Sequence, residues 1–111
     1  MFRAMLFTVL FGLVTSVASA QTLEFDVTPT NGPTVHVMLT TTAEGSQVYY
    51  NGVHQGGAAW TTSEGNIHIY DGMGHAVLGG AAGVDVGATG TVYDGNVDPP
   101  NNVAGSWKRV G

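Results

Sequence analysis

The chain has 111 residues, no cysteine and a formal net charge of −5, with only three basic residues. Arg3 stands near the start and Lys108 and Arg109 near the end, so the sequence offers no cluster of cations to neutralise phosphate groups. This composition argues against nucleic-acid binding and against attraction to an anionic membrane surface, and it excludes disulfides.

Residues 1–20 have the layout of a secretory signal peptide. One positive charge at Arg3 precedes an apolar run over residues 4–14, and residues 18–20 form the small-x-small sequence Ala-Ser-Ala. The run is shorter than the roughly 20 apolar residues that a membrane-spanning helix needs. We therefore expect cleavage after Ala20, a secreted protein that is extracellular or periplasmic, and no membrane insertion after cleavage.

Removing residues 1–20 from the 111 leaves 91, which suits a single secreted β domain over 21–111. Eight acidic residues then stand against Lys108 and Arg109, which gives a formal net charge of −6. A domain of this size buries only a limited core, so a metal ion or assembly with other copies would help to stabilise it.

The first two predicted strands show clear alternation. Residues 22–28 place Leu23, Phe25 and Val27 on one face, and residues 34–42 alternate in the same way after a turn at 30–33. Lysines, which commonly protect sheet edges, are missing from all strands before the last. Because terminal strands exchange easily, we expect residues 22–28 to form a free edge through which copies self-associate.

Asn51-Gly52 is a strong hairpin signal, because a type I′ turn needs positive φ at both central residues. Tyr-Asn-Gly at 50–52 and Tyr-Asp-Gly at 70–72 and 93–95 each indicate a strand end that leads into a tight turn. Further short strands are expected at 46–50, 53–55, 58–62, 67–70, 75–78, 84–86, 90–93 and 107–110, with 98–102 as an extended linker. These elements predict an all-β fold, a small antiparallel β-sandwich or barrel of about 7–9 short strands.

Two metal sites are candidates. Asp94, Asn96 and Asp98 space three oxygen ligands as a Ca²⁺ loop would, although the Gly and Glu of an EF-hand are missing and plain turn chemistry explains the same residues. His68, Met73 and His75 lie within eight residues and combine imidazole with thioether, which suits copper, although histidines on a polar strand face commonly just meet solvent. No cofactor is expected otherwise.

Aromatic residues give the other candidate site. Tyr49, Trp60, Tyr70 and Trp107 would stack on sugar rings if they are exposed, or fill the core if they are not. The sequence has no cysteine nucleophile and no Gly-x-Ser-x-Gly motif, so we do not expect an enzyme.

The sequence as a whole predicts a secreted, non-catalytic β domain that acts in extracellular binding or assembly. It would work by self-association through edge strands, or by binding carbohydrate or another surface. The alternative is a small secreted metal-binding protein that uses the Ca²⁺ loop or the copper residues.

Overall fold

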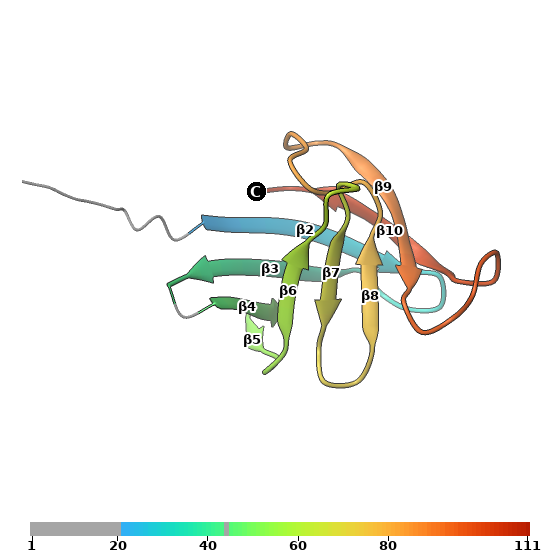
Figure 1. The fold of residues 1–111 in the computed structure, drawn as a ribbon, viewed down its shortest axis with the longest axis horizontal. Helices are drawn as coiled ribbons and strands as arrows, with labels where there is room; N and C mark the ends of the chain where they lie inside the picture. Colours follow the sequence, from blue (N-terminus) through green and yellow to red (C-terminus); the bar gives the residue numbers. More distant parts are fainter. Residues whose placement is uncertain (1–20, 44) are drawn as a thin grey trace, which may run out of the picture.

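A computed structural model of the protein describes residues 21–43 and 45–111. The predicted signal peptide and its cleavage site lie outside these residues. In this described part of the chain, nine antiparallel strands form one sheet, in the spatial order β5-β4-β3-β2-β10-β9-β8-β7-β6 (Figure 1). The strands are β2 (Gln21–Pro29), β3 (Val35–Thr42), β4 (Gly45–Tyr50), β5 (Val53–His54), β6 (Ala58–Thr61), β7 (Ile67–Tyr70), β8 (His75–Leu78), β9 (Thr89–Asp94) and β10 (Val103–Arg109).

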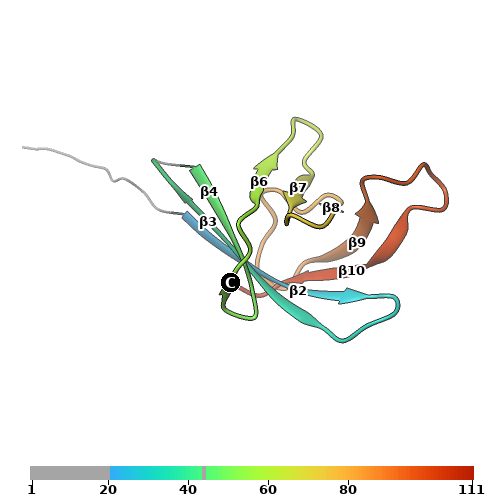
Figure 2. The same ribbon diagram turned by 90° about the horizontal axis from the view of Figure 1, so that it is seen from below.

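The predicted all-β antiparallel fold is confirmed, and the single sheet curls into a half-barrel. Figure 2 shows β6 to β8 on the side of the curl opposite β2 to β4. We call the inner side of the curl the trough, and the apolar core fills most of it. The two ends of the sheet approach each other where β6 packs beside β4, although these strands are not hydrogen-bonded neighbours. Within residues 21–43 and 45–111, no helix has the length and apolarity needed to cross a membrane.

The apolar side chains of the alternating strands face the inside of the curl. Phe25 is fully buried there, and its ring meets the ring of Trp107 edge-on at a centroid distance of 5.7 Å. The Trp107 Nε1–H donates a hydrogen bond to the Gly79 carbonyl at 3.1 Å. A side chain at Gly90, which lies opposite Trp107, would overlap the indole ring. The full buried set is Phe25, Val37, Leu39, Val48, Ile67, Ile69, Leu78, Ala81, Val92 and Trp107.

Three strands end at or next to the positions where the sequence predicts a tight turn. Asn51 and Gly52 have φ values of 50° and 84°, as a two-residue type I′ hairpin between β4 and β5 requires. Of the three strands that carry the Tyr-Asx-Gly sequences, β4 ends at its tyrosine, β7 ends at Tyr70 and β9 ends one residue after Tyr93.

The topology contradicts three details expected from the sequence. Strand β2 is not an edge, because it pairs with β3 on one side and with β10 on the other. Residues 84–86 form no strand, since positive φ at Gly80, Gly83 and Gly87 interrupts extended backbone throughout this region. Residues 98–102 belong to the β9–β10 hairpin loop rather than to an extended linker, and β10 starts earlier than expected.

A side-chain hydrogen bond ties the two halves of the curl together. The Tyr50 hydroxyl of β4 donates to Asp71 Oδ2 at 2.9 Å, while Asp71 Oδ1 accepts the backbone N–H groups of Met73 and Gly74, both at 2.9 Å. Burial and the neighbouring Asp71 carboxylate raise the pKa of Tyr50 well above its ordinary value, so the hydroxyl keeps its proton. Tyr50 thus anchors the β7–β8 turn to the opposite side of the trough.

We expect Tyr50→Phe to lower the free energy of unfolding by about 1.5 kcal/mol, because the variant removes a partly buried hydrogen bond to a charged acceptor. Tyr49→Phe on the same strand is the matched control and should change it by less than about 0.5 kcal/mol. Urea unfolding followed by the fluorescence of buried Trp107 measures both. Equal effects of the two variants would contradict the role given to this hydrogen bond.

Candidate aromatic and histidine site

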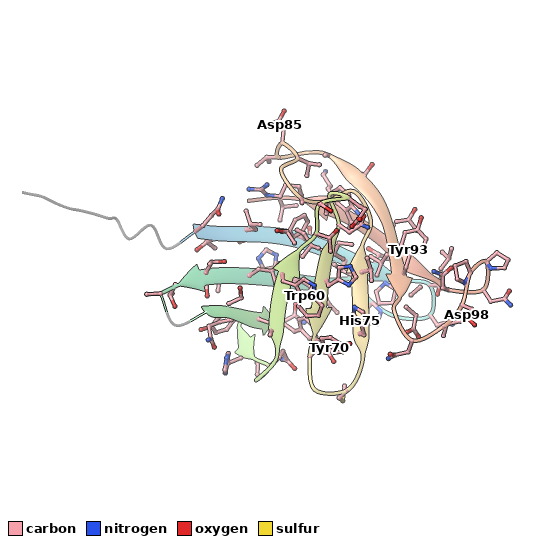
Figure 3. All side chains as sticks on the ribbon, in the orientation of Figure 1. Trp60, Tyr70, His75, Asp85, Tyr93 and Asp98 are labelled. Carbon is pink, nitrogen blue, oxygen red and sulfur yellow. The ribbon has the colours of Figure 1, made fainter. Side chains whose placement is uncertain are left out.

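Four aromatic side chains gather on the outer face of β6, β7 and β8, and we call them the aromatic patch: Trp60, His68, Tyr70 and His75. They share this face because Ile67 and Ile69 of β7 point into the core, so the intervening positions point outward. The register then pairs the four residues directly, Trp60 with His68 and Tyr70 with His75. Figure 3 labels Trp60, Tyr70 and His75 on these adjoining strands.

Most ring pairs in the aromatic patch are stacked, whereas the two histidine rings are tilted by 34° to each other. The Trp60 ring centroid is 5.2 Å from those of His68 and Tyr70, with interplanar angles of 13° and 26°. Tyr70 and His75 stack at 4.4 Å and 21°. Offset stacking at such distances is favourable, which fixes the ring orientations before any ligand arrives. Trp60 is still 41% exposed and Tyr70 46% exposed, so much of both side chains is open to solvent.

A hydrogen bond joins the two histidines of the patch across β7 and β8. His68 Nδ1 and His75 Nε2 are 2.8 Å apart, so one ring nitrogen donates and the other accepts. Two imidazolium rings would place N–H against N–H here, and this geometry therefore requires at least one neutral imidazole. Gly95 lies against the His75 ring, where any side chain would overlap it, and its N–H donates to the His75 carbonyl at 2.7 Å.

An open hollow with a mixed polar and apolar lining adjoins the patch. It has a volume of about 330 Å³, which is within the range of small-ligand sites. Both patch histidines line it together with Tyr93, Asp94 and Asn102. The hollow therefore places a carboxylate, an amide and a phenol beside a surface of stacked rings.

The structure separates the four aromatic residues proposed for ligand stacking. Trp60 and Tyr70 lie together in the patch. Tyr49 lies apart from them on β4, where its ring is 5.2 Å from that of His54. Trp107 is only 3% exposed and belongs to the core, so it offers no ring to a ligand.

The structure brings together only some of the proposed metal ligands. His68 and His75 meet, whereas Met73 lies in the β7–β8 turn and is 93% exposed. In the loop proposed for Ca²⁺, Asp94 Oδ1 accepts the Asn96 backbone N–H at 2.9 Å, and Asp98 lies further along the exposed hairpin loop (Figure 3). Within the described part of the chain, no three His, Asp or Glu side chains form a group suited to a metal ion. The calcium loop stays a prediction.

A second polar cluster lies on the outer face of β2 and β3, and the sequence analysis did not anticipate it. His36 Nε2 is 2.8 Å from Glu24 Oε1, and His36 Nδ1 is 3.1 Å from Asp26 Oδ1. The pairing of His36 with Asp26 in the β2–β3 register brings the three together. The hydrogen bonds to Asp26 and then to Glu24 raise the pKa of His36 above its ordinary value.

Comparison with protein-family models, with curated proteins and with solved structures finds no match to this chain. The chemistry of these surfaces is therefore the basis for assigning a function.

We expect the NMR titration of His36 to show a pKa above about 6.5, and Asp26→Asn to lower it. Because the folded-state pKa is raised, the stability that His36 contributes is complete below about pH 6.5 and is lost as the pH rises through the folded value. The pH dependence of the free energy of unfolding that His36 contributes should disappear in His36→Gln. In the wild type, high salt should make this pH dependence weaker. A wild type and a His36→Gln variant with the same pH profile of unfolding would contradict this assignment.

Proposed function

We propose that this chain is a secreted, non-catalytic binding module that takes a neutral carbohydrate on the aromatic patch and the adjoining hollow. The observation that carries the proposal is the pair of near-parallel, half-exposed rings of Trp60 and Tyr70, centred 5.2 Å apart. Aromatic faces bind the C–H face of a sugar ring, and their preset stacking keeps the entropic cost of binding low.

The groups beside the rings suit sugar hydroxyls. Asp94 and Asn102 of the hollow accept or donate hydrogen bonds, and the histidine pair adds one of each kind. These polar groups supply orientation, while the rings supply buried apolar area.

The scarcity of cationic side chains favours neutral sugars over acidic sugars as the ligand. The predicted mature chain carries only Lys108 and Arg109 as full cations. Arg109 lies on β10, the central strand of the sheet, where its guanidinium donates to the Gly111 and Val84 carbonyls. An acidic polysaccharide would meet the carboxylate of Asp94 without a compensating base, which costs binding energy.

The sheet topology gives less support to self-association through edge strands than the aromatic patch gives to carbohydrate binding. The edge strands are β5 and β6, and their two and four residues leave few backbone groups for another chain to pair with. Short edge strands are one of the devices by which sheet proteins avoid such pairing. Carbohydrate binding is therefore the better supported of the two functions.

We expect the protein to bind one member of a panel of neutral glycans, with glucan, mannan, xylan and chitin oligosaccharides titrated by calorimetry. Trp60→Ala should weaken that binding tenfold or more, since it removes the largest ring of the patch. Tyr49→Ala removes an aromatic ring from a different strand and should leave the affinity within about twofold. Equal affinity in the wild type and in Trp60→Ala, or no binding to any glycan of the panel, would overturn the proposal.

The histidine pair favours a second candidate function, the binding of Cu²⁺. Two metal–nitrogen bonds of about 2.0 Å at a right angle place their nitrogens about 2.8 Å apart. This equals the distance between His68 Nδ1 and His75 Nε2, so loss of the hydrogen bond and a turn of each ring by about 45° would direct both lone pairs toward one ion. Met73 would have to bend in from its exposed turn to complete the site.

If the histidine pair holds copper, Cu²⁺ should quench the emission of Trp60, whose ring centre is 5.2 Å from that of His68. His75→Gln should weaken this quenching tenfold or more, because one of the two nitrogen ligands is gone. His54→Gln, at an exposed histidine on β5, is the matched control and should bind Cu²⁺ as the wild type does. Met73→Leu shows whether the thioether takes part, and unchanged affinity in His75→Gln would reject the copper site.

A further inference from the structure

The inner face of the half-barrel is filled unevenly. Around the β2–β10 ladder the bulky rings of Phe25 and Trp107 pack edge-on. Toward the β2–β3 turn, the inward side chains of these two strands are smaller, among them Val27 and Val35, which pair with each other. A hollow of about 220 Å³ remains at this end of the trough.

Small residues on the facing strands keep this hollow open. Ala76 of β8 and Ala104 of β10 line it, and a larger side chain at either position would take up its volume. Pro29 and Ile69 add to a lining in which every residue except Tyr50 is aliphatic. The space is a half-open hollow rather than an enclosed void, and its apolar lining has no packing partner on the open side.

Water is a poor occupant of the hollow. An internal water molecule needs two to four polar partners, and the one polar side chain of the lining is Tyr50. Its hydroxyl proton is already donated to Asp71. The hollow is open to solvent on one side, so an apolar ligand that enters it displaces water that has few hydrogen-bond partners there.

We infer that this hollow is a binding site for a small neutral apolar molecule, the size of one aromatic ring or a short aliphatic chain. Burial of such a molecule is favourable because it removes apolar surface from water on both partners. Pro29 and Ala104 are half-buried rather than buried, so the site is reached from the end of the trough. It is separate from the aromatic patch, which lies on the outer face of the same sheet.

The test uses xenon and benzene as probes with the wild-type protein, followed by NMR. We expect dose-dependent shifts at the methyl groups of Val27, Ala76 and Ala104, direct contacts between benzene protons and these methyls, and a rise in melting temperature with probe concentration. Xenon cannot stack on rings as benzene does, and Trp60→Ala removes the main ring of the patch. If xenon and benzene shift the same methyl groups, and if these shifts persist in Trp60→Ala, the probes bind inside the trough and not on the aromatic patch.

Ala104→Leu fills the hollow and should reduce the probe-induced shifts at Val27 and Ala76 tenfold or more, while Ala43→Leu in an exposed turn should leave them unchanged. Should Ala104→Leu fail to fold, the contacts mapped in the wild type still decide the matter. Shifts confined to Trp60 and Tyr70, or no shifts with either probe, would overturn the inference.

Discussion

Burial of the apolar face of one sheet is the constraint on which the rest of this structure depends. A sheet with one apolar face must cover it, usually with a second sheet or a layer of helices. The described residues form a single sheet, so its two halves cover each other by curling. Phe25 and Trp107 lie close to the middle of this arrangement, and the Tyr50–Asp71 hydrogen bond joins the halves at the open side.

The alternation of inward and outward side chains along each strand determines which residues lie on the outer surface of the curl. Each inward residue of the short strands fixes an outward neighbour, so burying Ile69 presents His68 and Tyr70 to solvent. The antiparallel register then brings residues of β6 and β8 into contact with them. The patch is therefore a consequence of core packing, and its geometry is as rigid as the ladders that hold it.

Local sequence patterns predicted most of the strands, because alternation and turn residues act over a few positions. Strands β7 and β8 lie at the predicted bounds, and the Asn51-Gly52 turn has the predicted positive φ values. Which strands become neighbours is a long-range property, and the position of β2 between β3 and β10 has no local signal.

The candidate site was predictable to a similar extent. Residue type alone predicts Trp60 and Tyr70 as ligand-stacking residues. The contact between His68 and His75, in contrast, depends on the β7–β8 register. Trp107 was proposed for ligand stacking but is buried, and the polar residues on either side of it, Ser106 and Lys108, form the alternation that is typical of an inward ring.

Strand β8 shows how closely the outer and inner surfaces are connected. Its first residue, His75, belongs to the aromatic patch, and the next one, Ala76, lines the apolar hollow inside the trough. The two surfaces share backbone but no side chains. Pairing of Ala76 with both Ile69 and Asp94 resists displacement of this strand, because any shift would break ladders on two sides. A ligand that fits the hollow without moving β8 therefore leaves the outer rings in place. If a ligand of the hollow moves β8 and so changes the affinity of the patch for its own ligand, occupancy of the patch changes the affinity of the hollow by the same factor.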